Sequence, residues 1–173
     1  MKHKLAVLFT GLILVFTIAL LISIIRKVEI LSLKESRIKT LPPFSFLTLS
    51  GTVFNSEEIE RGPLVIIFFD PGCNHCRYEI SELIKYGNKI TLQKFLLISE
   101  AEKEELVKFY NDFQLEKQPG MTLLIDKNYS FRDIFRTKHV PSTFIYSREL
   151  SLIKSFKGEV KPETILECLT YND

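Results

Sequence analysis

The sequence predicts an α/β domain with a mixed central sheet flanked by helices, preceded by one N-terminal transmembrane helix. A long uncharged apolar segment lies near the start of the 173-residue chain. Short apolar runs rich in β-branched and aromatic residues follow, and they alternate with patterns of helical period. The last two runs are joined by a short polar turn, and this order of strands and helices indicates the α/β class.

The composition excludes several classes of protein. Lys and Arg number 23 and Asp and Glu 21, so the net charge of +2 provides no basic field for nucleic acid. A hydrophobic content of 46% with 7 Gly and 7 Pro excludes disordered and collagen-like chains. Three cysteines are too few for a fold framed by disulfides. We therefore expect a folded domain that binds no nucleic acid.

The N-terminal segment has the length and composition of a membrane span. Residues 5–25 carry no charge, and a helix of this length reaches roughly 30 Å, the thickness of a bilayer core. No small-x-small cleavage site ends the segment, and no lipid-carrying cysteine follows it. We therefore predict an uncleaved anchor over residues 1–27 that contacts the membrane through 5–25. Residues 28–42 are expected to form an exposed stalk that ends in prolines.

Residues 43–173 are predicted to form one domain without internal repeats. The run Leu64–Phe69 is apolar throughout and has glycine and proline on both sides, as expected for a central strand buried on both faces. Similar runs predict further strands at 95–98, 121–125, 143–147 and about 151–157.

Helical patterns fill the intervals between these runs. From Cys76 to Gly87 apolar residues recur on one helical face. Ser99 to Glu102 has the pattern of a capping box that opens a second helix, and Pro162 suits the first position of a terminal helix. The apolar faces of these two helices are expected to hold Leu106, Val107, Tyr110 and Phe113, and Ile165, Leu166 and Leu169, respectively.

The strongest chemical signal is the Cys-x-x-Cys pair of Cys73 and Cys76, which follows the buried strand and opens the next helix. A helix N-terminus presents unpaired N–H groups and partial positive charge, so it favours Cys73 as a thiolate nucleophile toward a disulfide. Cys76, one turn on, is placed to resolve the resulting mixed disulfide. His75 lies between them, and a cationic or hydrogen-bonding imidazole would favour the thiolate further and make the disulfide more oxidising.

Three other roles of a Cys-x-x-Cys pair have to be considered. A zinc site needs two more ligands, and His75, His139 and Cys168 show no paired spacing that would supply them. Covalent haem attachment requires histidine directly after the second cysteine, and Arg77 occupies that position. The third alternative is a disulfide with a purely structural role. We expect no metal and no cofactor.

Two motifs together resemble a known family. Residues 68–76, Phe-Phe-Asp-Pro-Gly-Cys-Asn-His-Cys, and residues 140–145, Val-Pro-Ser-Thr-Phe-Ile, are similar to two parts of a thioredoxin fold. The layout resembles the membrane-anchored thioredoxin-like (TlpA-like, redoxin superfamily) thiol-disulfide oxidoreductases. The segment 44–53 is similar to their extra strand and turn. Gly72 stands where thioredoxins usually carry Trp, and Ile67 replaces their buried acid, so proton handling is expected to differ.

The resemblance implies roles for three residues outside the pair. In the family, the proline at the position of Pro141 is cis and packs against the dithiol, and the adjacent backbone, here Val140, offers hydrogen bonds to substrate. Glu79 lies one turn after Cys76, where several TlpA-like proteins carry a glutamate that tunes or relays the cysteine protons. The alternative for Glu79 is a solvated helix glutamate.

The resemblance also implies partners and a location. We expect cysteine-containing protein substrates and a separate redox partner protein. The family implies a single-pass protein of the bacterial inner membrane whose catalytic domain faces the periplasm. Counting Lys and Arg on either side of the apolar segment instead places the domain in the cytoplasm. The residues do not determine whether the protein oxidises or reduces its substrates.

Two alternative functions belong to other classes. A peroxiredoxin-type thiol peroxidase would need a Pro-x-x-x-Thr-x-x-Cys setting, whereas Pro71 lies too close to Cys73 and no Thr stands three residues before it. A non-catalytic thioredoxin-like binding module would use a disulfide between Cys73 and Cys76 only as a staple at the helix end.

Overall fold

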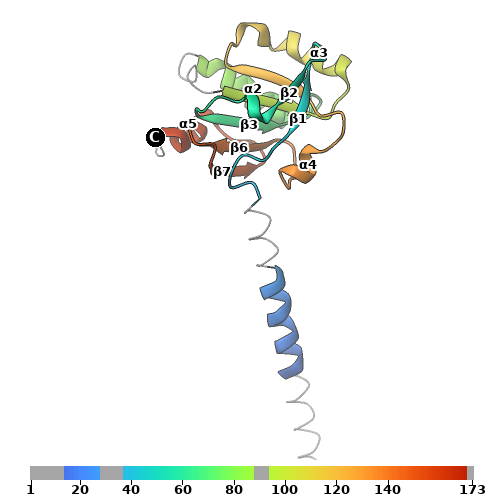
Figure 1. The fold of residues 1–173 in the computed structure, drawn as a ribbon, viewed down its shortest axis with the longest axis vertical. Helices are drawn as coiled ribbons and strands as arrows, with labels where there is room; N and C mark the ends of the chain where they lie inside the picture. The colour runs from blue at the N-terminus through green and yellow to red at the C-terminus, as the bar shows by residue number, and fades with distance from the viewer. Residues whose placement is uncertain (1–13, 28–36, 88–93, 171–173) are drawn as a thin grey trace, which may run out of the picture. The chain divides into compact units, whose positions relative to one another are not determined.

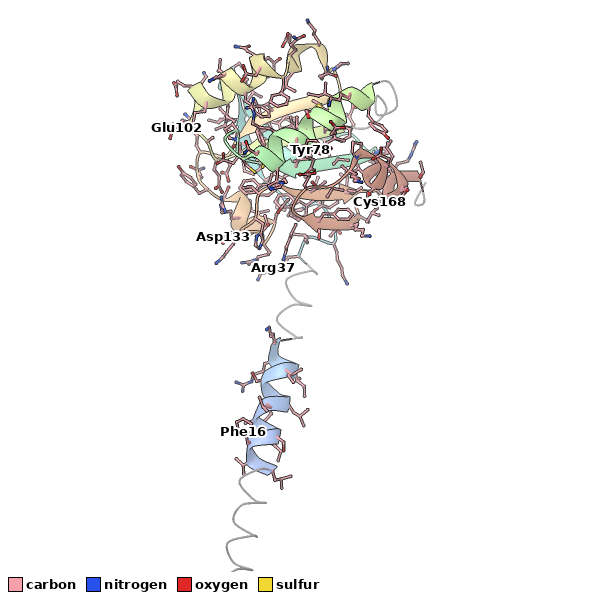
Figure 2. All side chains as sticks on the ribbon, turned by 180° about the vertical axis from the view of Figure 1, so that it is seen from behind. Phe16, Arg37, Tyr78, Glu102, Asp133 and Cys168 are labelled. Atoms are coloured by element: carbon pink, nitrogen blue, oxygen red, sulfur yellow. The ribbon has the colours of Figure 1, made fainter. Side chains whose placement is uncertain are left out.

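The structure is a computed structural model, and it describes residues 14–27, 37–87 and 94–170. The chain divides into two compact units, Met1–Arg37 and Ile38–Asp173. In the first unit, residues 14–27 are helical and their side chains project outward, as Figure 2 shows around Phe16.

The helix at 14–27 overlaps the expected membrane span at 5–25. Of the helices in the described ranges, none is long and apolar enough to cross a membrane. The first part of the expected span lies outside the described residues, so the anchor stays a prediction.

Within the described part of the second unit, one sheet contains seven strands, β1 Ser45–Thr48, β2 Val53–Asn55, β3 Leu64–Phe68, β4 Lys94–Ser99, β5 Met121–Ile125, β6 Ser142–Tyr146 and β7 Leu152–Lys157. Their order across the sheet is β2-β1-β5-β4-β3-β6-β7 (Figure 1). Strand β4 pairs in parallel with β3 and β5, whereas β6 pairs antiparallel with β3 and β7. The predicted mixed sheet is therefore confirmed, and β1 and β2 form the extra strand and turn expected at 44–53.

The sheet separates two hydrophobic cores. The described helices of this unit are α2 Asn74–Tyr86, α3 Lys103–Asp112, α4 Phe131–Ile134 and α5 Pro162–Thr170, with 3₁₀ turns at Ser56–Glu58 and Leu115–Lys117. Alternate residues of β3 point to opposite faces, so Val65 and Ile67 pack with α2, α3 and α5, whereas Ile66 and Phe68 pack with α4. Strand β3 is thus buried on both faces, as its apolar run predicts.

The start of α3 differs from the prediction. Ser99 is the last residue of β4, and the N-cap of α3 is Glu102, which makes no side-chain capping bond. The hydroxyl of Ser99 accepts a hydrogen bond from the Ala101 N–H at 3.2 Å. The expected capping box is therefore wrong, because strand pairing extends through Ser99 and the helix begins after it.

The folded unit also begins before the expected boundary at residue 43. Ile38 is only 6% exposed, and its carbonyl accepts a hydrogen bond from the Tyr146 hydroxyl at 3.2 Å. Two backbone hydrogen bonds join the same segment to the start of β7, Leu41 N to Leu150 O at 2.9 Å and Leu152 N to Lys39 O at 2.7 Å. Residues 38–42, which were expected in the stalk, therefore belong to the folded unit.

Replacing Phe131 by alanine is expected to destabilise the second unit strongly. This fully buried ring stacks on Phe68 and Phe135, with centroid distances of 4.5 and 4.2 Å. The lost burial and the cavity should reduce the free energy of unfolding by about 3–5 kcal/mol. Urea unfolding of the full chain followed by circular dichroism measures this loss. The matched control is Tyr78→Ala, an aromatic side chain that is 53% exposed, and equal losses in the two variants would contradict the prediction.

Candidate active site

A tight turn carries the chain from β3 into α2. The Asp70 carboxylate accepts a hydrogen bond from the Gly72 N–H at 2.7 Å, and the Asp70 carbonyl accepts one from the Cys73 N–H at 3.1 Å. A Cβ at Gly72 would lie 3.2 Å from the Asp70 carboxylate, which makes the turn tight for any larger residue. Asp70 is thus a turn residue, and the turn places Cys73 at the N-cap of α2.

The two sulfurs of the pair lie in different environments. Cys73 is partly exposed, whereas Cys76 is fully buried. The Cys73 sulfur accepts a hydrogen bond from the Cys76 N–H at 3.3 Å, so a donor of the first helical turn is directed at it. Burial raises the pKa of the Cys76 thiol, and Cys73 and Glu79 raise it further. Cys73 is therefore the accessible sulfur and Cys76 the protected one.

Glu79 lies on α2, one turn after Cys76, and is only 1% exposed. The Thr143 hydroxyl donates to its Oε1 at 2.7 Å, and the Val160 N–H donates to its Oε2 at 3.2 Å. Burial raises the pKa of Glu79 to about 7, although both hydrogen bonds lower it, and the charge of Glu159 raises it slightly. The alternative of a solvated helix glutamate is wrong, because this carboxyl group is enclosed and can exchange a proton near neutral pH.

The second motif lies at the same edge of the sheet as the turn that leads into the dithiol. The Val140–Pro141 peptide bond is cis, as the resemblance implied. Phe68 at the end of β3 pairs with Ser142 at the start of β6, so the strands place the turn before Cys73 and the segment around Pro141 at the same sheet edge. Pro141 is buried and Val140 is partly exposed.

His75 points to a different partner from the one expected. Its side chain is 77% exposed, and its Nδ1 lies 2.9 Å from the Oε2 of Glu159, which is 32% exposed. The histidine therefore forms a surface pair with the connection between β7 and α5. Its effect on the thiols stays a prediction.

Three further residues contribute to the site, namely Thr143, Glu159 and Val160. Thr143 is the fourth residue of the Val-Pro-Ser-Thr motif, so its place in the motif is a sequence signal for a residue of the site. Glu159 and Val160 contact α2 from positions 84 and 81 residues away, and no sequence pattern marks them. No cluster of three His, Cys, Asp or Glu side chains suited to a metal ion occurs in the described residues.

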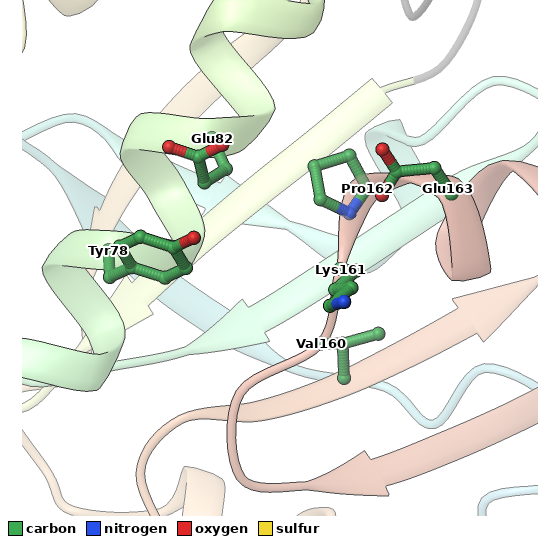
Figure 3. A pocket seen from close by; sticks show the side chains of 6 residues that line it. All are labelled: Tyr78, Glu82, Val160, Lys161, Pro162 and Glu163. Carbon is green, nitrogen blue, oxygen red and sulfur yellow. The ribbon is translucent and has the colours of Figure 1, made fainter.

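A small groove of ≈ 200 Å³ borders the site on the side of α5. In Figure 3, Tyr78 and Glu82 lie on α2, and the segment that precedes and opens α5 lines the other side of the groove with Val160, Lys161, Pro162 and Glu163. Because the N–H of Val160 binds Glu79, the groove borders the segment that holds the buried carboxylate.

A sequence model of the thioredoxin-like domain matches residues 55–172. No curated protein sequence matches the chain.

Solved structures of thiol-disulfide proteins share the fold. DsbF of Mycobacterium tuberculosis is 18% identical with a TM-score of 0.66, and the match covers 79% of this chain and 97% of that one. A thio-disulfide isomerase of Thermus thermophilus is 22% identical with a TM-score of 0.63, covering 78% and 94%. The peroxidoxin BcpB of M. tuberculosis is 16% identical with a TM-score of 0.66, covering 78% and 96%. At these identities the likeness concerns the fold alone.

Proposed function

Since the chain belongs to the family of thioredoxin-like domains, we propose that it is a membrane-tethered thiol-disulfide oxidoreductase that exchanges disulfides with cysteine-containing proteins. The observation that carries this proposal is the asymmetry of the pair. A partly exposed Cys73 sulfur caps α2, and a fully buried Cys76 thiol lies one turn behind it. A pair that served only as a staple has no need of one accessible sulfur.

Written in the reducing direction, the proposed exchange has two steps. The Cys73 thiolate attacks one sulfur of a substrate disulfide, forms a mixed disulfide and releases the other substrate sulfur as a thiolate. The Cys76 thiol then loses its proton and attacks the Cys73 sulfur, which releases the second substrate thiolate and leaves a Cys73–Cys76 disulfide. Two electrons pass to the substrate, whose thiolates take up two protons. A redox partner protein with a dithiol restores the pair by the reverse steps.

Glu79 is the proposed proton acceptor for Cys76. Burial raises the pKa of both groups, and a carboxylate with a pKa of about 7 is half ionised at neutral pH. The hydrogen bonds from Thr143 and Val160 hold this carboxylate in place. The raised pKa and these hydrogen bonds therefore support a catalytic role for Glu79 in the second step.

The substrate is proposed to bind along the second motif. Val140 is partly exposed beside the buried Pro141, at the sheet edge that also holds the turn before Cys73. A substrate segment lying there in extended form would present its sulfur to Cys73 and its backbone to Val140.

The tether and the location remain part of the proposal. The uncharged residues 5–25 support insertion in the bacterial inner membrane as a single span. The family resemblance supports a periplasmic position for the domain, whereas the Lys and Arg count supports the cytoplasm. A reporter that works in only one of the two compartments, fused to the C-terminus, distinguishes them.

Trapping of substrates tests the proposed exchange. In the full chain, Cys76→Ser removes the resolving thiol, so a mixed disulfide between Cys73 and its partner should accumulate and separate on non-reducing gels. Cys73→Ser is the matched control, and it should trap nothing. If neither variant forms an adduct with a disulfide-containing protein in vitro, the non-catalytic binding module becomes the better interpretation.

A peroxide assay separates the peroxidase alternative. The similarity of fold to a peroxidoxin makes this alternative worth measuring, although Cys73 lacks the Thr three residues before it that such enzymes use. We expect the reduced chain to consume hydrogen peroxide no faster than a simple thiol does. Rapid turnover would favour the peroxidase.

A further inference from the structure

Three consecutive residues between β7 and α5 contact three different parts of the site. The Gly158 N–H donates to the Pro141 carbonyl at 2.8 Å, Glu159 pairs with His75 at 2.9 Å, and the Val160 N–H donates to Glu79 at 3.2 Å. Gly158 has a φ of +97°, a conformation that favours glycine. The backbone bonds on either side of Glu159 thus fix its position relative to α2.

Glu159 faces the imidazole of His75, whose positive charge in the protonated form would act on the dithiol. His75 is the second residue of α2 and lies between the two cysteines in the sequence. A histidine becomes cationic on the acid side of neutrality, and a cation near a helix N-terminal sulfur stabilises its thiolate. A carboxylate 2.9 Å from the imidazole compensates that charge, because the fields of the two members of a close ion pair largely cancel at a distance.

We propose that Glu159 is a positioning residue that compensates the charge of His75 and so keeps the Cys73–Cys76 pair more reducing than its sequence implies. The inference rests on the proposed exchange and concerns its direction. A stabilised thiolate makes a disulfide more oxidising, so compensation of the cation moves the pair toward the reducing side.

Other charged and titratable groups lie on the two elements that carry His75 and Glu159. On α2 they are Cys73, Cys76 and Glu79, whose pKa Glu159 also raises. On the α5 side, Lys161 and Glu163 line the groove opposite Tyr78 and Glu82. Any effect of Glu159 that passes through these groups persists when His75 is replaced, whereas an effect through the imidazole does not.

A double-mutant cycle on the full chain tests the inference. The variants are Glu159→Gln, His75→Asn and the two combined, and the readout is the rate at which iodoacetamide alkylates Cys73, followed by mass spectrometry of the peptide. Glu159→Gln should raise this rate about fivefold at pH 6 and less than about twofold at pH 8, because a histidine side chain in general carries less positive charge at the higher pH. In the His75→Asn background the same substitution should change the rate less than about twofold at either pH.

Equilibration with glutathione gives the second readout. Glu159→Gln should increase the ratio of reduced to oxidised pair at a fixed glutathione poise at pH 6, and only when His75 is present. The control is Glu60→Gln, which removes an exposed partner of Lys94 on another part of the domain and should change neither readout.

Two outcomes overturn the inference, namely no change on Glu159→Gln and an equal change in both histidine backgrounds. The proposed function is judged separately, because alkylation and the glutathione equilibrium require no protein substrate. A chain that shows the expected cycle but never forms an adduct through Cys73 with a disulfide-containing protein keeps the inference and loses the proposed function.

Discussion

Replacing Cys73 by serine is expected to lower the rate of disulfide exchange on the order of a thousandfold or more at pH 7. A serine hydroxyl is not ionised at this pH and cannot form a disulfide, so the first step has no substitute. The fold should persist, because Cys73 is partly exposed and serine is a favourable N-cap residue that can accept the bond from the Cys76 N–H. Reduction of a disulfide-containing peptide by the full chain, recycled with dithiothreitol, measures the rate.

Cys168→Ser is the matched control for this substitution. Cys168 lies on α5, outside the proposed machinery, and its replacement should leave the exchange rate within about twofold of the unmodified chain. The assignment of Cys73 as the nucleophile fails if Cys73→Ser retains the rate, or if Cys168→Ser loses it to the same extent.

Replacing Glu79 by glutamine is expected to remove a pH dependence of stability. Burial raises the pKa of Glu79 from its ordinary 4.5 to about 7 in the folded chain. Between these values the folded state binds more protons than the unfolded state, so stability falls as the pH rises. This carboxyl group therefore lowers the free energy of unfolding by up to about 3 kcal/mol from pH 4.5 to pH 8. Glutamine does not ionise, so this fall should be absent from the variant.

The same substitution affects exchange. Glutamine keeps an oxygen for the Thr143 hydroxyl but cannot take a proton from Cys76, so the release of substrate from the mixed disulfide should slow on the order of 100-fold at pH 7. Urea unfolding at pH 4.5, 6 and 8 measures the stability, and single-turnover release measures the second step. Glu82→Gln, three residues further along α2, should leave both profiles unchanged. If the free energy of unfolding of Glu79→Gln fell with pH as steeply as that of the unmodified chain, the raised pKa assigned to the buried Glu79 would be contradicted.

The parts of the fold that sequence predicts are those with a local pattern. The apolar run at 64–69 identifies β3 because every residue of the strand is buried, and Pro162 begins α5 where its missing N–H costs nothing. The apolar run before Ser99 does not show where β4 ends. Ser99 suits a helix N-cap equally well, and only its pairing with the neighbouring strand makes it the last residue of β4. On α3, Leu106 and Phe109 are buried whereas Val107 is 39% exposed. Apolar residues occur on two adjacent faces of this helix, and packing against the sheet determines which face is buried.

The site residues also fall into those that a local sequence motif predicts and those that depend on contacts with distant parts of the chain. The Cys-x-x-Cys spacing and the cis-proline motif are short in sequence, so Cys73, Cys76 and Pro141 could be named from the chain alone. The burial of Glu79 could not be deduced, because Thr143 and Val160 enclose it from positions 64 and 81 residues away. The pairing of His75 with Glu159 is likewise a product of the β7–α5 connection and leaves no trace in the local sequence.

If the proposed exchange takes place, the enclosure of Cys76 means that the release of a substrate depends on a group inside this domain. A small oxidant, or a thiol from solution, can reach only the outer sulfur, because the inner one is 0% exposed. The inner sulfur attacks from within the same chain, and such reactions have effective molarities far above the thiol concentration of any cell. Under the proposed exchange, the lifetime of each mixed disulfide would therefore be set by this domain and not by its surroundings, and substrates would be released one at a time without an external thiol.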